Sequence, residues 1–230
     1  MVIVDAFTAE YSSVAVDDSG EVWSWGANNY SQLGRDTSGA DSATPARVEL
    51  SPGVYLNGVE AVSGSSRLVA ALKTNGEVWT WGYSDYLGLG NLSSHQLVPQ
   101  QVSITAVDAI AVGKYYSEPH TLALKSDGSV WGWGDNDLGQ LGTGNTGFAY
   151  TPVRVQQEGG GYLSNVVAIA AGDQYSLALK SDGTVWSWGY DYQGRLGYDV
   201  ISDSKQLLAK QISGLSGITQ RKAGSAFGLA

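Results

Sequence analysis

Short apolar stretches recur along the whole chain, separated by turns rich in glycine, asparagine and aspartate. In the last quarter they predict four strands, at residues 166–172, 175–180, 184–189 and 207–212. Equivalents of the second strand stand at residues 12–16, 69–73 and 120–125, and equivalents of the fourth at 44–50, 98–104 and 151–157. The pattern therefore predicts a unit of four short strands that is repeated along the chain.

The repeat is clearest in one motif that is written four times. Its copies are DSGEVWSWGANNYSQLG (18–34), TNGEVWTWGYSDYLGLG (74–90), SDGSVWGWGDNDLGQLG (126–142) and SDGTVWSWGYDYQGRLG (181–197). The first tryptophans of successive copies, at positions 23, 79, 131 and 186, stand 56, 52 and 55 residues apart. A period of this size is typical of solenoids, propellers and similar arrays.

All the tryptophans fall in the W-x-W step of these copies: Trp23, Trp25, Trp79, Trp81, Trp131, Trp133, Trp186 and Trp188. Residues i and i+2 of a strand share a face, so we expect each pair to stand side by side in the core. One buried pair contributes on the order of 8–12 kcal/mol as an upper bound. The residue between the two is always small, which we interpret as close approach of a neighbouring sheet.

The turns and prolines around the motif complete the predicted unit. A glycine at position 20, 76, 128 or 183 precedes each W-x-W step and predicts a two-residue hairpin. Pro45, Pro99 and Pro152 start the fourth strands, which places those strands at an edge of the sheet. The predicted fold is all-β, a β-propeller-type array of four-stranded antiparallel blades.

We expect a single domain over residues 1–230 with repeats at about 1–57, 58–105, 106–164 and 165–213. Residues 214–230 align with the first two strands of a further repeat, so the prediction is four full blades and part of a fifth. Such an array is an open or partial propeller, or a piece of a longer one, unless it closes in another way.

The stretch from Leu122 to Gly142, LALKSDGSVWGWGDNDLGQLG, resembles the repeat of the regulator-of-chromosome-condensation family. The resemblance covers nearly the whole chain and implies a β-propeller. The near-uniform sequence of the copies resembles that of bacterial and bacteriophage members of the family. Ser31 and Leu87 replace glycine of the family pattern and Arg195 replaces glutamine, which indicates local changes in the loops. The best-known member is a nucleotide-exchange factor for a small GTPase that also binds chromatin, but no exchange-factor site residue can be matched here.

Charge and composition narrow the classes of partner. The net charge of −9 argues against a nucleic-acid or anionic-membrane surface, although an acidic face suits a basic protein partner. No apolar run is long enough to span a bilayer, and no signal peptide is recognisable at the N-terminus. Cysteine is absent, which excludes disulfides and thiolate metal sites. We expect a soluble protein, either cytoplasmic or part of an extracellular or virion assembly.

Candidate catalytic chemistry is sparse. His95 and His120 lie in different repeats, and His120 takes the position of Tyr175, so we expect it to have a packing role. The glycine-rich stretch 142–147 matches a dinucleotide motif but opens no predicted helix. The acidic turns at 135–139 and 191–194 offer oxygen ligands for calcium, yet they sit where the family has a structural turn. We therefore predict no catalytic residue, no cofactor and no metal site.

The repeats differ most in the loop after the tryptophans, where tyrosines are mixed with acids. These tyrosines are Tyr30, Tyr83, Tyr86, Tyr190 and Tyr192. Tyrosine suits protein or glycan recognition, because it offers a large contact area with a polar tip; the alternative is that the rings pad the turn. The third copy also inserts KYYSEP, residues 114–119, which brings Tyr115 and Tyr116 forward as the strongest contact candidates.

The sequence thus predicts a non-enzymatic scaffold that binds a protein partner through loops on one propeller face. The alternatives are a structural component of a larger assembly, such as a bacteriophage virion or a cell-surface protein that packs against copies of itself, and a glycan-binding adhesin. A nucleotide-exchange role ranks last.

Overall fold

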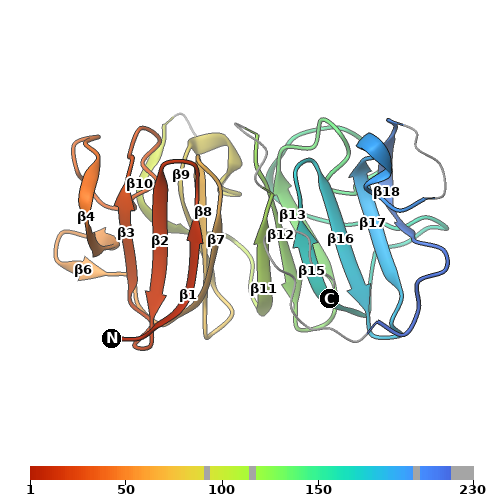
Figure 1. Cartoon of the computed structure of the whole chain (residues 1–230), viewed down its shortest axis with the longest axis horizontal. Helices are drawn as coiled ribbons and strands as arrows, with labels where there is room; N and C mark the ends of the chain where they lie inside the picture. Colours follow the sequence, from red (N-terminus) through yellow and green to blue (C-terminus); the bar gives the residue numbers. More distant parts are fainter. Residues whose placement is uncertain (91–93, 114–117, 199–202, 219–230) are drawn as a thin grey trace.

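The computed structural model describes residues 1–90, 94–113, 118–198 and 203–218. Four antiparallel sheets of four strands follow one another along the chain (Figure 1). Blade 1 holds β1 (Ile3–Thr8), β2 (Ser12–Asp17), β3 (Val22–Gly26) and β4 (Ser42–Arg47), and blade 2 holds β7 (Val59–Gly64), β8 (Leu68–Lys73), β9 (Val78–Gly82) and β10 (Gln96–Gln101). Blade 3 holds β11 (Val107–Val112), β12 (His120–Lys125), β13 (Val130–Gly134) and β14 (Ala149–Arg154), and blade 4 holds β15 (Val166–Ala171), β16 (Tyr175–Lys180), β17 (Val185–Tyr190) and β18 (Lys205–Gln211).

The strand order within each sheet is the order along the chain, so the fourth strand lies at one edge as the prolines predict. The first strands of successive blades, β1, β7, β11 and β15, contact one another and form the inner side of the array. This is the arrangement of a propeller, and the predicted all-β fold class is confirmed.

The blades stack through the end of the repeated motif. In blade 1, Leu33 folds back beneath β3, where the Ser24 hydroxyl donates to its carbonyl at 2.6 Å. Gly34 then lies under the Trp81 indole of blade 2, and the Trp81 Nε1–H donates to the Gln32 carbonyl at 3.0 Å. Trp188 repeats the contact on Gly142, with its Nε1–H donating to the Gln140 carbonyl at 2.8 Å.

The small residue of W-x-W therefore has a different cause from the expected one. It faces the returning leucine of its own loop, and the neighbouring sheet lies beyond that loop. At Gly132 an added Cβ would stand 3.0 Å from the Leu141 side chain. In blade 4 the Ser187 hydroxyl donates to the Leu196 carbonyl at 2.7 Å. A larger middle residue would displace the leucine on which the next blade rests.

The loop of blade 2 corrects the alignment of the motif. The Thr80 hydroxyl donates to the Leu87 carbonyl at 2.8 Å, and Gly88 lies under Trp133. Leu87 and Gly88 thus take the places that the sequence pattern gives to the final Leu-Gly, and the loop is shortened. Leu87 is the packed leucine of this blade and not a replaced glycine. The shortened loop offers no carbonyl to the buried Trp133 Nε1, which has no hydrogen-bond partner among the described residues.

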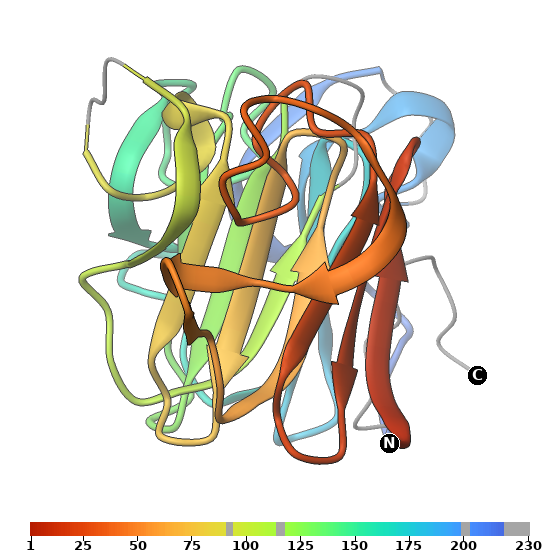
Figure 2. The ribbon, with the colours of Figure 1, turned by 90° about the vertical axis from the view of Figure 1, so that its left-hand side faces the viewer.

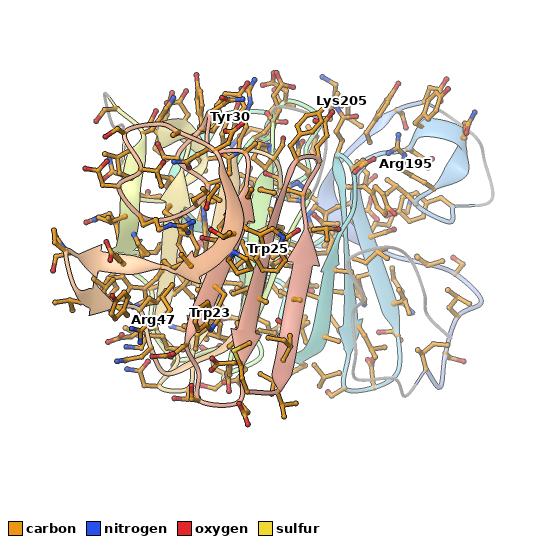
Figure 3. The ribbon with its side chains drawn as sticks, turned by 60° about the vertical axis from the view of Figure 1, so that its left-hand side comes forward. Trp23, Trp25, Tyr30, Arg47, Arg195 and Lys205 are labelled. Atoms are coloured by element: carbon orange, nitrogen blue, oxygen red, sulfur yellow. The ribbon has the colours of Figure 1, made fainter. Side chains whose placement is uncertain are left out.

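The tryptophans differ in burial according to their place in the array. Trp81, Trp133 and Trp188, the second of each pair, are fully buried against the preceding blade. Trp25 takes the same place in blade 1, where no described blade precedes it, and remains partly exposed (Figure 3). The first tryptophan of each pair is also partly exposed. The core role expected for all of these residues therefore applies in full to three of them.

The turns before the tryptophans are three-residue hairpins, and not the expected two-residue type. In blade 1 the Gly20 N–H donates to the Asp17 carbonyl at 2.9 Å, and the Asp17 N–H donates to the Glu21 carbonyl at 3.1 Å. Only the glycine has positive φ, at 77°. A turn followed by one left-handed glycine is the usual geometry of a three-residue hairpin. The same turn recurs at Gly76, Gly128 and Gly183.

The connections that follow blades 1 and 3 contain an outer hairpin, and the connection between β10 and β11 does not. Blade 1 continues into a small outer hairpin, β5 (Glu49–Ser51) and β6 (Val54–Tyr55), and β5 contacts β10 of blade 2 (Figure 2). Blade 3 has an equivalent excursion in which Gln156 pairs with Tyr162 and Gln157 pairs with Ala209 of β18. In both hairpins an arginine stacks on a tyrosine, Arg47 on Tyr55 at 3.7 Å and Arg154 on Tyr162 at 4.7 Å. Blade 1 is thereby fastened to blade 2, and blade 3 to blade 4.

The described chain ends where a further blade would begin. The Ile218 N–H donates to the Gly183 carbonyl at 3.3 Å, as Val59, Val107 and Val166 donate to the equivalent turns. Ile218 also packs against the apolar side of blade 4. The predicted strands of a fifth blade continue into residues 219–230, which lie outside the described part of the chain.

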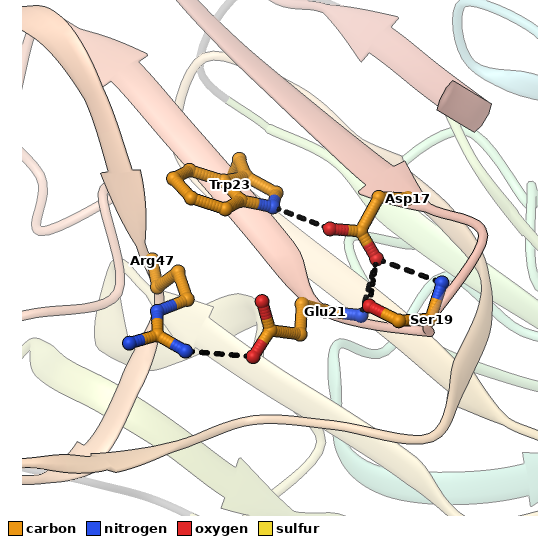
Figure 4. A network of polar contacts seen from close by, with 5 residues as sticks. All are labelled: Asp17, Ser19, Glu21, Trp23 and Arg47. Atoms are coloured by element: carbon orange, nitrogen blue, oxygen red, sulfur yellow. Dashed lines mark hydrogen bonds and ion pairs between the residues drawn. The ribbon is translucent and has the colours of Figure 1, made fainter. Parts of the chain in front are cut away.

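A carboxylate organises the hairpin turn of blade 1 (Figure 4). Asp17 accepts hydrogen bonds from the Ser19 N–H and hydroxyl, the Glu21 N–H and the Trp23 Nε1–H, the last at 2.8 Å. Although burial acts in the opposite direction, these bonds lower the pKa of Asp17 to about 2. The other blades carry lysine here, with each ammonium over the first tryptophan ring at 4.0–5.8 Å.

We expect Asp17→Asn to lower the free energy of unfolding at neutral pH by about 1–3 kcal/mol, because an amide is a weaker acceptor for these donors. Thermal unfolding followed by circular dichroism measures this loss. The lowered pKa makes the contribution of Asp17 present above about pH 4 and lost as the pH falls toward 2. The difference between the two proteins should therefore shrink at acidic pH; a constant difference would contradict the role of the carboxylate.

Candidate functional site

The loops that follow the third strands and the turns between first and second strands meet at one end of every blade, here called the loop face. Figure 3 shows Tyr30, Arg195 and Lys205 at this face. It shows Trp23 and Arg47 toward the opposite end, here called the hairpin-turn end. In three blades an Asn or Asp fixes the loop by accepting the N–H of the packed leucine: Asn28 from Leu33, Asn136 from Leu141 and Asp191 from Leu196.

A continuous series of rings crosses the loop face from blade 1 to blade 3. We call it the aromatic row, and it consists of Tyr30, Tyr83, Tyr86, His95, Phe148 and Tyr150. The Tyr83 ring lies 5.9 Å from Tyr30 and 5.7 Å from Tyr86. Phe148 continues the row at 5.5 Å from Tyr86 and 4.6 Å from Tyr150. The His95 ring packs 4.5 Å from Tyr83.

Both exposed and buried rings take part in the row. Tyr86 is buried and anchors it, Tyr30, Tyr83 and Phe148 are partly exposed, and His95 and Tyr150 are exposed. The guanidinium of Arg67 lies over two of the rings, 4.8 Å from Tyr30 and 5.0 Å from Tyr83. The row is thus a preassembled surface whose rings hold one another in place.

Blade 4 carries a second aromatic group on the same face. The guanidinium of Arg195 lies 5.4 Å from Tyr175, 5.4 Å from Tyr190 and 5.3 Å from Tyr192. Its Nη1 donates to the Asp173 carbonyl, at 2.6 Å, which ties the loop to the turn before β16. Arg195, which replaces the glutamine of the family pattern, is therefore the centre of this group.

The pKa values of two groups beside or within the aromatic row are shifted by burial and by nearby charges. Burial raises the pKa of the Asp135 carboxyl to about 6, and the charges of Asp137 and Glu118 act in the same direction. Burial also raises the pKa of Tyr86 to about 12; the charges of Glu118, Asp135 and Asp85 add to this shift, and the charge of Arg67 opposes it. The acids at this part of the loop face therefore outnumber the one cation of the described residues, Arg67, whose charge acts at Tyr86.

The structure brings the predicted contact tyrosines into two groups on one face. Tyr30, Tyr83 and Tyr86 join the aromatic row, and Tyr190 and Tyr192 join the group around Arg195. Tyr115 and Tyr116 lie outside the described residues. The sequence interpretation gave no contact role to His95, Phe148, Tyr150 or Arg67, since these positions are not shared between the copies.

The candidates for catalytic, dinucleotide or metal chemistry lie among packed or loop residues. His120 is buried, and its Nε2 lies 3.0 Å from the Ser176 hydroxyl, which in turn donates to the Gln140 carbonyl at 2.7 Å. The stretch 142–147 forms part of the loop between β13 and β14. Within the described ranges no group of three or more potential ligands is placed to hold a metal ion, and no helix there is long and apolar enough to cross a membrane.

The stacked four-stranded blades, with their repeated Trp-on-Gly contact, define a β-propeller repeat protein. The regulator of chromosome condensation (RCC1) repeat model matches residues 19–72, 75–118 and 127–179. The chain therefore belongs to the RCC1 repeat family.

Known relatives share the array over most of the chain. The human E3 ubiquitin-protein ligase HERC2 is 31% identical over 94% of this chain, which spans 4% of HERC2. The ultraviolet-B receptor UVR8 of Arabidopsis thaliana is 31% identical over 91% of this chain and 46% of its own length. Prp20p of Saccharomyces cerevisiae superimposes with a TM-score of 0.76 at 26% identity, covering 96% of this chain and 52% of Prp20p. The chain thus spans about half or less of the length of these three relatives.

These relatives come from human, plant and yeast, and they give no support to the expected bacterial or bacteriophage character. They likewise give no support to a virion role or a glycan partner. The solved structure of Prp20p was described together with its binding to Gsp1p and histones, which are protein partners.

Proposed function

We propose that this chain is a non-enzymatic protein-interaction module that binds its partner through the loop face. The observation that carries the proposal is the aromatic row, which joins three blades into one surface. Tyrosines supply large contact area at low cost in conformational entropy, and a set already packed together loses little further freedom on binding.

The relatives support the same class of function. Prp20p binds the proteins Gsp1p and histones. Activities of the longer relatives, such as the ligase activity in the name of HERC2, do not transfer, because the chain matches only 4% of that protein. What transfers is a propeller used as a recognition surface.

Peptides selected from a random display library against the whole chain test this proposal. We expect the double change Tyr30→Ala and Tyr83→Ala to weaken the selected peptides by about tenfold or more, since paired aromatic anchors commonly carry 1–3 kcal/mol. Tyr162→Ala is the matched control, because Tyr162 is 52% exposed but lies in the outer hairpin of blade 3.

Binding is measured by fluorescence anisotropy, and thermal unfolding confirms that each variant is folded. Equal affinity of the double variant and the parent protein would overturn the proposal. So would a loss caused by Tyr162→Ala that matches the loss caused by the double change.

A further inference from the structure

We propose that the segment recognised by the loop face is basic and presents arginine to the aromatic row. This inference rests on the proposed function and names the chemistry of its partner. Three features of the structure support it: the rings already accept guanidinium groups, the face carries an excess of acids, and no salt bridge joins three of those acids, Asp85, Glu118 and Asp137, to a basic side chain of the described residues.

The chain's own arginines show what the tyrosines accept. Arg67 lies over Tyr30 and Tyr83, and Arg195 lies among three tyrosines. Lysines instead lie over tryptophans at the hairpin-turn end, with Lys210 on Tyr198 as the exception. A planar guanidinium stacks on a ring and still donates hydrogen bonds from its edge, which an ammonium cannot do.

The loop face carries more acidic than basic side chains. Its described loops and turns contain the following acids: Glu10, Asp36, Asp41, Asp85, Glu118, Asp135, Asp137, Asp173, Asp191 and Asp203. Asp135 and Asp191 are buried beneath the surface. Their basic residues are Arg35, Arg67, Arg195 and Lys205, of which Arg35 is buried and donates to backbone beneath β3. An acidic face beside exposed rings is complementary to a basic partner.

The acids near the row are not neutralised by the described chain. The ion pairs Glu21–Arg47 and Lys73–Glu77 both lie at the hairpin-turn end. Across residues 1–90, 94–113, 118–198 and 203–218, no salt bridge joins Asp85, Glu118 or Asp137 to a basic side chain. Lys205 reaches the backbone carbonyl of Asp137 at 2.8 Å and not its carboxylate.

Asp85 and Glu118 lie close enough to the rings to act on the same ligand. Asp85 stands next to Tyr86 in the chain, and the charges of Glu118 and Asp135 reach the Tyr86 hydroxyl. A guanidinium stacked on Tyr83 or Phe148 would therefore sit within a negative potential. Nucleic acid and acidic peptides carry the same sign of charge as this potential, so the face disfavours them.

Short Gly-Ser peptides that differ only in their charged residue test the inference. One carries arginine, one lysine, one glutamate and one no charge, and each is titrated into the whole chain by fluorescence anisotropy. We expect the arginine peptide to bind about tenfold or more tighter than the glutamate and neutral peptides, and several-fold tighter than the lysine peptide. Raising the salt concentration should weaken the arginine peptide.

Two charge variants locate the effect. Asp85→Asn together with Glu118→Gln should weaken the arginine peptide by about threefold to tenfold, whereas Asp108→Asn, at an exposed acid in β11, should leave it unchanged. Neutral or glutamate peptides that bind best and depend on Tyr30 and Tyr83 would overturn the basic partner and leave the proposed function standing. Arginine binding that is equally sensitive to Asp108→Asn, or insensitive to the tyrosines, would overturn the assignment to this face.

Discussion

Replacing Trp81 by alanine should lower the free energy of unfolding by about 3–5 kcal/mol, a large share of the stability of an ordinary domain. The indole is fully buried between blades 1 and 2. It covers Gly34, where an added Cβ would stand 2.7 Å from its Nε1, and that Nε1–H donates to the Gln32 carbonyl. Removing it opens a cavity and leaves this carbonyl without its donor. Urea unfolding at neutral pH measures the loss.

Trp25→Ala is the matched control for this prediction. Trp25 holds the same position in the motif, but its blade has no described neighbour on that side and the ring is partly exposed. We expect a loss of about 1–2 kcal/mol, because less apolar area is returned to water. Similar losses for Trp25→Ala and Trp81→Ala would contradict the account of how the blades stack.

We expect acidic pH to lower the free energy of unfolding through His120. Burial lowers the pKa of His120 to about 3, against 6.5 for an ordinary histidine. Below about pH 6.5 this histidine is protonated in the unfolded chain but stays neutral in the folded chain. The free energy of unfolding therefore falls as the pH drops toward 3. Between pH 7 and pH 5 the loss is about 2 kcal/mol. His120→Leu, which copies Leu68 of blade 2, should remove that part of the pH dependence.

Asp135 acts in the opposite direction and must be separated from His120. Its pKa is raised to about 6, so the folded chain binds this proton first and stability from the site rises as the pH falls from 6 to 4. In Asp135→Asn this gain is absent, and the acid sensitivity from His120 should become steeper. Urea unfolding at pH 7 and pH 5 for the parent and both variants distinguishes the two groups. An unchanged pH dependence in His120→Leu would contradict the assignment to the histidine.

The repeat made much of the fold predictable. Tryptophan pairs and hairpin glycines recur in every blade and edge prolines in three of them, so the repeated four-stranded unit follows from the sequence. The propeller class follows from this unit together with the family resemblance. The candidate face was also predictable in part, because Tyr30, Tyr83, Tyr86, Tyr190 and Tyr192 stand in the loops where the copies differ.

What escaped prediction depends on contacts between repeats. The stretch YLGLG holds two Leu-Gly steps, and only the position of Trp133 over Gly88 shows that the first one is used. The aromatic row contains residues from three blades, so Phe148 can be recognised as part of it only from its contact with Tyr86. Burial of Trp25 depends on a neighbour, and the motif itself is the same in every blade.

Hydrogen–deuterium exchange with and without the tightest selected peptide tests the central claim most directly, since it maps the bound surface without mutation. We predict slower exchange in the loops at residues 27–34 and 83–90 and around Phe148 and Tyr150. The hairpin turns at Gly20, Gly76, Gly128 and Gly183 should exchange at unchanged rates. Protection confined to those turns or to the outer hairpin β5–β6 would contradict a loop-face interaction module.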